Sequence, residues 1–307
     1  MSTVGAALQH MWEKNWPELH AAATGGLPRF IIARRPREFD SGVPVFCYHV
    51  VNAEAFEADL EFLARNGYVT IDADALLDHL EQRRPVPPSA VVLTIDDGAR
   101  NLYEVAFPLL QGYGMKAVAF IATQFHQEEG DDASHARQNN LLYPLNWSQI
   151  RRMHTLGIID FQSHTHGSRY VPRWPEAAGL EGSDPEVVHA LRGPALTVAE
   201  DFRLAKEILE RKLNKTVRHL AFPRFDGTAE AVRIGRACGY EAFWWGVLPH
   251  RPSNRPGQSP LYVTRVDGRY LRRLPGVGRV PLSRVLRTRY RGSASRFRSQ
   301  MSLGVRR

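Results

Sequence analysis

The feature that most constrains this fold is a regular alternation of short apolar runs with longer segments of helical periodicity. The apolar runs predict strands, and apolar residues at a spacing of three to four, such as Phe56, Leu60 and Leu63, predict amphipathic helices between them. This alternation is typical of a parallel sheet with right-handed crossovers, either open or closed as a barrel. The expected strands are 43–48, 68–71, 90–95, 117–122, 158–162, 217–222, 241–245 and 261–266.

Polar residues gather directly after several of the expected strands. Asp96 and Asp97 follow strand 90–95, His164 and His166 follow strand 158–162, and His49 follows strand 43–48. Arg224 and Asp226 come after strand 217–222. In parallel α/β folds the functional residues collect at the carboxyl ends of the strands. The sequence therefore predicts a functional site at that end of the sheet, with a site-edge or structural role for His49.

The pair Asp96-Asp97 carries the first chemical signal. Two adjacent carboxylates at a strand end repel one another unless a cation neutralises one of them. One metal-bound aspartate beside one free aspartate would provide a ligand and a base that deprotonates water. The alternative interpretation is a simple turn after a strand, because Asp97-Gly98 is a common turn dipeptide.

The histidines of the segment Ser163-His164-Thr165-His166 carry the second signal. Imidazole is a good ligand for zinc, cobalt and iron, and it often joins an aspartate in hydrolytic metal sites. A single loop histidine is more often a surface or hydrogen-bonding residue. Here two histidines lie within three residues, and they are in register with an aspartate pair on another strand. This arrangement favours a metal site.

An ordered set of segments resembles the polysaccharide deacetylase family, also called the NodB-homology or carbohydrate esterase family 4 fold. The resemblance is to the branch that acts on poly-N-acetylglucosamine, and it spans about residues 43–267. That family implies an α/β fold, a distorted (β/α) barrel, as a single main domain with a basic C-terminal tail here. The matching segments are 45–49, 56–68, 91–98, 106–110, 145–147, 163–165, 221–223 and 239–240.

The resemblance implies that the chain hydrolyses the N-acetyl group of an N-acetylated sugar, polysaccharide or lipid-linked glycan precursor. It makes Asp96 the general base, and Asp97 and His164 ligands of one divalent metal, with Zn²⁺ expected before Co²⁺ or Ni²⁺. The metal would polarise the acetyl oxygen and make its water more acidic. The backbone N–H of Arg224 would stabilise the oxyanion, and the Arg224 side chain would bind an anionic sugar, pair with Asp96 or lie in solvent.

The chain departs from the family pattern at the second histidine ligand, which lies four residues after the first and is Ser168 here. A hydroxyl is a poor zinc ligand, so His166 or a residue of another loop would have to complete the site. His250 is the candidate for the late histidine acid, or else a plain loop residue. The alternative function is a non-catalytic carbohydrate-binding or assembly module, and a hydrolase of a non-sugar amide or ester shares every motif.

The net charge of +8 belongs to the end of the chain, because residues 281–307 contain eight arginines and no acid. We expect this tail to contact anionic membrane lipids or to be simply solvated, and we expect no nucleic-acid binding because no such module is present. The predicted division is an N-terminal flank at 1–42, the deacetylase domain at 43–267 and an Arg-rich extension at 268–307.

Two further expectations concern location and cysteines. The N-terminal residues lack the apolar core of a secretory signal, and no stretch approaches the ~18 apolar residues of a membrane span. These features predict a cytoplasmic, membrane-associated or freely soluble protein. Cys47 and Cys238 are the only cysteines, so we expect them to pack as small hydrophobic residues and not as a disulfide.

Overall fold

The computed structural model describes residues 18, 20–22, 24–35, 42–128, 141–167, 196–225 and 227–288. Its strands are β1 (Val45–Tyr48), β2 (Val69–Thr70), β3 (Ala90–Asp96), β4 (Ala117–Ile121), β5 (Ile159–Ser163), β6 (His219–Ala221), β7 (Ala242–Trp244) and β8 (Val266–Asp267). They form one sheet in the order β7-β6-β5-β4-β3-β1-β8, with β2 beside β3. Every pair of neighbouring strands is parallel, which confirms the predicted α/β class.

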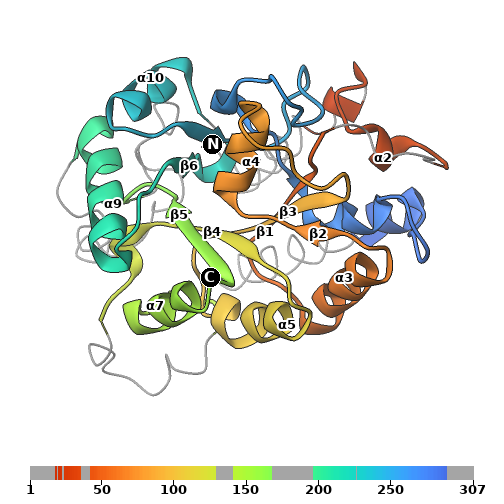
Figure 1. The fold of residues 1–307 in the computed structure, drawn as a ribbon, viewed down its shortest axis with the longest axis horizontal. Helices are drawn as coiled ribbons and strands as arrows, with labels where there is room; N and C mark the ends of the chain where they lie inside the picture. Colours follow the sequence, from red (N-terminus) through yellow and green to blue (C-terminus); the bar gives the residue numbers. More distant parts are fainter. Residues whose placement is uncertain are drawn as a thin grey trace, which may run out of the picture.

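Helices connect the strands and cover the outer face of the curved sheet. Figure 1 shows α9, α7, α5 and α3 in an arc around the strands. The α-helices are α2 (Arg29–Ile32), α3 (Ala53–Arg65), α4 (Ala73–Leu80), α5 (Phe107–Gly112), α7 (Trp147–Thr155), α9 (Val198–Leu213) and α10 (Ala229–Ala237). A π-helical segment, η1 (Leu102–Ala106), precedes α5, and short 3₁₀ segments are η2 (Thr123–Phe125), η3 (Pro223–Phe225), η4 (Pro260–Tyr262) and η5 (Gly268–Arg273).

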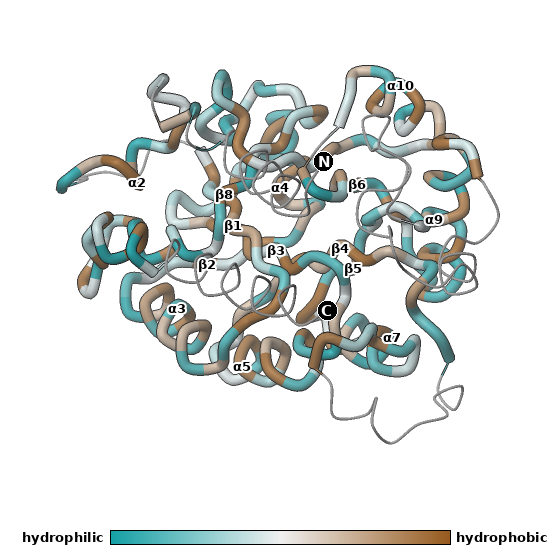
Figure 2. Tube along the Cα trace, turned by 180° about the vertical axis from the view of Figure 1, so that it is seen from behind, coloured by the Kyte–Doolittle hydropathy of each residue, from teal (hydrophilic) through white to brown (hydrophobic). Residues whose placement is uncertain are grey.

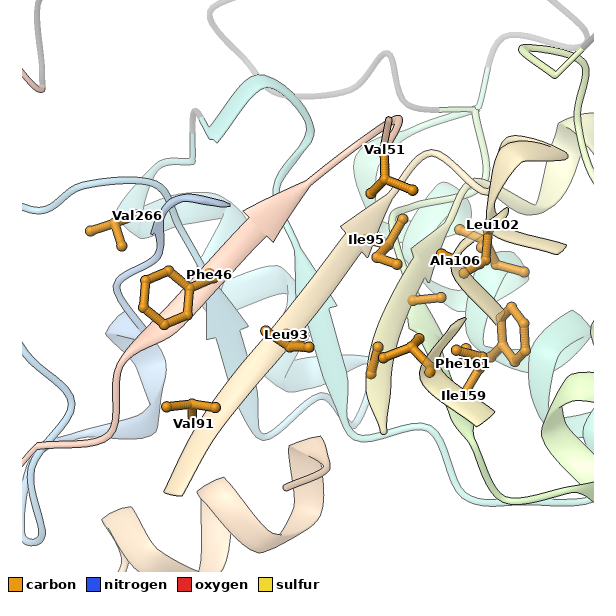
Figure 3. Close-up of a cluster of buried hydrophobic side chains, with 14 of the residues drawn as sticks. Phe46, Val51, Val91, Leu93, Ile95, Leu102, Ala106, Ile159, Phe161 and Val266 are labelled. Atoms are coloured by element: carbon orange, nitrogen blue, oxygen red, sulfur yellow. The ribbon is translucent and has the colours of Figure 1, made fainter. Parts of the chain in front are cut away.

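The sheet is buried on both faces, and this explains the near-continuous apolar run of β3. Alternate residues of β3, such as Leu93 and Ile95, pack outward against the helices in the cluster of Figure 3. Val92 belongs instead to a second cluster inside the barrel, as does Phe120 of β4. Figure 2 shows the hydrophobic residues along the central strands, with hydrophilic residues alternating along the surrounding helices.

Helix α4 covers the amino-terminal end of the barrel interior, where its Leu76 joins the inner apolar cluster. Asp74 in its first turn lies 3.0 Å from Nε2 of the fully buried His219 on β6. The other ring nitrogen, Nδ1, accepts a hydrogen bond of 3.3 Å from the indole N–H of Trp244 on β7. This end of the barrel is thus closed by a helix and by a polar pair whose histidine is buried.

Residues 263–267, which we call the closing segment, complete the distorted barrel. Val263 exchanges backbone hydrogen bonds with β7 at one end of the segment, and Val266 pairs with Phe46 of β1 at the other. The predicted strand 261–266 is wrong over its first half. Pro260 opens a 3₁₀ turn there, and the Ser259 side chain accepts the Leu261 N–H, so extended structure is confined to the closing segment.

Residues on both flanks of the predicted domain contribute to its core. Ile31 before β1 and Tyr270 and Leu271 after β8 are buried with the outer cluster. Arg273 donates to the carbonyl oxygens of Ile31 and Ala33, which lie at the end of α2. The division of the chain at residues 42 and 267 stays a prediction. No helix in the described ranges has the length and apolarity needed to cross a bilayer.

Candidate functional site

Asp96 ends β3 inside the barrel and is only 1% exposed. Its Oδ1 accepts a hydrogen bond of 2.7 Å from Nη1 of Arg265 on the closing segment, and its Oδ2 lies 3.5 Å from the Cys47 thiol on β1. Burial raises the pKa of this carboxyl, but the charge of the Arg265 guanidinium bonded to it works in the opposite direction, and the pKa lies below its usual value. Asp96 is therefore an ionised carboxylate at neutral pH.

Asp97 and His164 meet at the mouth of the barrel. Asp97 Oδ1 lies 3.6 Å from His164 Nε2, and the aspartate side chain is 60% exposed whereas the histidine is buried. His164 Nδ1 lies 2.8 Å from the Ala221 carbonyl oxygen. A carbonyl can only accept, so Nδ1 carries a proton, and in the neutral tautomer this leaves the Nε2 lone pair facing Asp97.

This arrangement sets two hydrogen-bond acceptors against each other, so a proton or a metal cation has to lie between them. A histidine that donates Nδ1–H to a backbone carbonyl and points Nε2 at a carboxylate has the usual arrangement of a metal ligand. Asp97 and His164 thus fit a divalent cation as two donors. Within the part of the chain that the structure describes, no group of three or more His, Cys, Asp or Glu could hold a metal ion.

A buried carboxylate fixes the loop that carries His164. Asp201, in the first turn of α9 and fully buried, accepts the backbone N–H groups of His166 at 3.1 Å and Gly167 at 2.7 Å. The Ser163 hydroxyl accepts the backbone N–H of Thr165 at 3.2 Å. These bonds hold a turn that the local sequence alone would not favour, because Thr165 has a positive φ of 71°.

Strained backbone gathers around this end of the barrel. Asp97 (φ 72°), Thr165 (φ 71°), Arg224 (φ 56°) and Phe225 (φ 63°) all have left-handed conformations and follow β3, β5 or β6. Non-glycine residues rarely adopt this conformation unless the surrounding structure imposes it, and such residues cluster at functional sites. The backbone geometry therefore points to the same end of the sheet as the side chains.

His166 lies beside the pair but faces another partner. Its ring is half-buried, and Nδ1 is 2.8 Å from the Thr123 hydroxyl oxygen on η2. Burial lowers the pKa of His166, so the ring is neutral near pH 7. Its assignment as a metal ligand stays a prediction. Ser168, the position of the family's second histidine, lies outside the described residues.

The other predicted site residues are more exposed. Arg224 follows Pro223 at the end of β6 with an exposed side chain, and Asp226 lies outside the described residues. His250 is exposed in a turn closed by the backbone hydrogen bond from Arg251 to Leu248. His49 is exposed at the end of β1, with its ring edge-on to Phe225 at 5.9 Å. The roles predicted for these residues stay predictions.

Sequence reasoning missed Arg265, which is fully buried and pairs with Asp96. Its Nε donates to the Trp245 carbonyl oxygen at 2.9 Å, and its guanidinium carbon lies over the rings of Phe120 and Phe225, 5.4 and 5.2 Å from their centroids. A single arginine inside the predicted strand 261–266 was the only signal in the sequence. Asp201 was missed because an acid in the first turn of a helix is an ordinary feature.

Comparison with known proteins agrees with this geometry. The model of the polysaccharide deacetylase family matches residues 83–243, slightly more than half of the chain. The chain is similar to the poly-beta-1,6-N-acetyl-D-glucosamine N-deacetylase of Escherichia coli (strain K12), with 28% identity over 127 residues, which are 39% of this chain and 18% of that protein. The corresponding enzyme of Staphylococcus aureus (strain MRSA252) is 20% identical over 230 residues, covering 74% of this chain and 70% of that protein. The chain thus spans less than a fifth of the length of its Escherichia coli relative.

Solved structures show the same fold. IcaB from Ammonifex degensii superposes with a TM-score of 0.57 and 24% identity, covering 74% of this chain and 92% of that chain. The BpsB deacetylase domain from Bordetella bronchiseptica gives a TM-score of 0.56 with 19% identity, covering 76% and 99%. Identities this low support the distorted barrel alone.

Proposed function

Because this chain belongs to the polysaccharide deacetylase family, we propose that it removes the acetyl group from an N-acetylated sugar or polysaccharide by metal-dependent hydrolysis. The observation that carries the proposal is the pair of facing acceptors, Asp97 Oδ1 and His164 Nε2, beside the buried carboxylate of Asp96. The sugar, its linkage and the lipid-linked form of the substrate are part of the proposal. So is the choice of Zn²⁺ before Co²⁺ or Ni²⁺.

In the proposed reaction, water attacks the acetyl carbonyl carbon, and the carbon–nitrogen bond then breaks to give acetate and a free amine. Asp96 takes the proton from the attacking water, because its ion pair with Arg265 keeps it ionised. Asp97 and His164 would hold the metal, which supplies a positive charge that polarises the acetyl oxygen and acidifies water. The Arg224 N–H is the proposed second donor to the developing oxyanion, and His250 is the proposed proton source for the amine.

The test is acetate release from N-acetylglucosamine oligomers and from lipid-linked N-acetylated glycans, with Zn²⁺, Co²⁺ or Ni²⁺ added to metal-stripped protein. We expect release with wild type and a loss of about 100-fold or more with Asp96→Asn, since general base catalysis contributes at least that much. Circular dichroism serves as the control for folding. Folded wild type that releases no acetate from any substrate with any metal would contradict the proposal.

The alternative is a carbohydrate-binding or assembly module without hydrolytic activity, and it rests on Ser168 in place of the family's second histidine. Metal analysis separates the two functions. Stoichiometric metal that is retained by wild type and lost in Asp97→Ala supports the hydrolase. Metal-free protein that still binds N-acetylated glycan supports the module.

Contact of the Arg-rich tail with anionic membrane lipids is a separate part of the proposal. Of residues 281–307, those after 288 lie outside the described residues, so the argument is their charge alone, with about 1 kcal/mol expected for each arginine near the surface. The test is co-sedimentation with phosphatidylserine vesicles and with neutral vesicles. Binding to the anionic vesicles that disappears on deletion of residues 289–307 supports the contact, and equal sedimentation with both vesicles contradicts it.

A further inference from the structure

The two oxygens of the Asp96 carboxylate are held in different ways. Oδ1 accepts a charged hydrogen bond from Arg265 Nη1, whereas Oδ2 is turned toward the Cys47 thiol. Arginine and a carboxylate commonly form two parallel hydrogen bonds, because the planar guanidinium presents two N–H groups that match two oxygens. Here one half of that match is missing.

The donor that lacks a partner belongs to the Arg265 side chain. Nη2 of Arg265 is fully buried and has no hydrogen-bond partner among the residues that the structure describes. A buried donor without an acceptor costs roughly 1–3 kcal/mol. The Asp96 carboxylate does not supply the missing acceptor, because its Oδ2 faces the Cys47 sulfur instead.

Cys47 is placed to hold Oδ2 in this orientation. The register of β1 against β3 pairs Cys47 with Thr94, and Asp96 follows two residues further along the same inward face. Burial, together with the neighbouring Asp96 charge, outweighs the effect of Arg265 and raises the pKa of the Cys47 thiol well above its usual value. The sulfur therefore keeps its proton and donates to Oδ2.

We propose that Cys47 is a positioning residue, whose thiol prevents the Asp96 carboxylate from closing a two-bond ion pair with Arg265. The catalytic part of this inference rests on the proposed function, in which Asp96 accepts a proton from water. A thiol is a weak donor, so it orients Oδ2 and leaves the oxygen able to accept that proton. Two charged N–H groups on the two oxygens would hold the carboxylate more tightly and make it a weaker base.

The kinetic test compares Cys47→Ala and Cys47→Ser with Cys238→Ala, which removes the other, half-buried thiol of the chain. We expect kcat of Cys47→Ala to fall by about 10-fold or more with KM unchanged, because the base is displaced while substrate binding is not. The serine hydroxyl can donate in the same direction, so Cys47→Ser should stay within about threefold of wild type. Cys238→Ala should match wild type. A Cys47→Ala enzyme with wild-type kcat would overturn the proposal.

A second readout tests the contact without any need for activity. In the Cys238→Ala protein only the Cys47 thiol contributes to the S–H stretching band of the Raman spectrum. We expect this band at a lower frequency than that of Cys238 in the Cys47→Ala protein, and we expect it to rise when Asp96→Asn replaces the charged acceptor with a weaker one. A band that Asp96→Asn does not shift would overturn the contact. A shift in a protein that hydrolyses no substrate would leave the contact intact and reject the proposed function instead.

Discussion

The barrel carries a histidine–aspartate pair at each end, and the two pairs differ in which ring nitrogen bears the proton. At the amino-terminal end, the Trp244 indole can only donate to His219 Nδ1, so Nε2 carries the proton and donates to Asp74 at 3.0 Å. At the carboxyl end, the backbone carbonyl of Ala221 accepts a hydrogen bond from Nδ1–H of His164. The His164 lone pair then faces Asp97 across 3.6 Å.

The difference separates a structural pair from a candidate metal-binding pair. Every donor around the His219 ring has an acceptor, so that pair is complete as it stands and binds α4 to the barrel. The pair of His164 and Asp97 is incomplete, since it places an acceptor against an acceptor at an open mouth. The same two residue types therefore stabilise the fold at one end and fit a cation at the other.

We expect the largest effect from a variant that breaks the carboxyl-end pair of Asp97 and His164. Asp97→Ala should lower acetate release by more than about 100-fold, since loss of a direct ligand exceeds the 10–100-fold cost typical of residues that only support ligands. Metal content after dialysis should fall with it. The matched control at the other end, Asp74→Ala, should keep its activity per folded molecule within about twofold. Equal losses in both variants would contradict the comparison.

His166→Ala tests which side chain completes the carboxyl-end pair. If His166 turns from Thr123 to the metal, its loss should weaken Co²⁺ binding by about 10–100-fold, less than the loss of Asp97. The measurement is the visible absorbance of the protein during titration with Co²⁺. His154→Ala on α7 is the control and should titrate like wild type. Unchanged Co²⁺ affinity in His166→Ala would reject His166 as a ligand.

His219→Ala tests the amino-terminal pair through stability. The change leaves the buried Trp244 N–H without its acceptor, which costs about 1–3 kcal/mol, with a further cost for the cavity, while Asp74 keeps its ion pair with Arg218. The melting temperature should fall by several degrees at about 2–4 °C per kcal/mol. Urea denaturation measures the loss, and Co²⁺ affinity of the folded protein should not change. A fall in Co²⁺ affinity alone would show that the two ends are not independent.

The smallest expected effect is the pH dependence of the stability that the pair of Asp74 and His219 contributes. Hydrogen bonding to His219 lowers the pKa of Asp74 from 3.8 to about 2. A carboxyl whose pKa is depressed by folding stabilises the native state fully above its unfolded pKa, and that stability is lost as the pH falls from about 4 to about 2. Half of the side chain is exposed, so solvent screening reduces the effect. In Asp74→Asn the urea midpoint should vary less between pH 4 and pH 2 than it does in wild type. A pH dependence equal to that of wild type would contradict the assignment.

Local sequence patterns were sufficient to bring together the candidate residues that lie at strand ends, and their roles stay predictions. Asp96, Asp97 and His164 each follow a predicted strand, and parallel topology brings such positions together. Cys47 was correctly expected to be buried, but nothing in its neighbours along the chain indicates a carboxylate 3.5 Å from its sulfur. Packing across strands, and not periodicity along them, decides that contact.

The contacts that sequence patterns missed are those between distant segments. The pair of Asp74 and His219 joins residues 145 positions apart, and it depends on α4 folding across the end of the barrel. Arg265 was predicted only as part of a plain strand, which the 3₁₀ turn at Pro260 shortens. Neither partner can be read from its neighbours along the chain, because each contact depends on how the barrel closes.

Closure of the barrel also has a consequence for the order of folding. Asp96 and Arg265 are 169 residues apart, so the carboxylate has no cationic partner until the closing segment docks between β7 and β1. Contacts of such large sequence separation form late and slowly, and a nascent chain that lacks its last strand cannot make them. A ribosome-bound chain or a truncation that ends before residue 263 would carry the Asp96-Asp97 motif without the ion pair that holds the proposed base. The proposed activity would thus require that the whole barrel has been synthesised and closed.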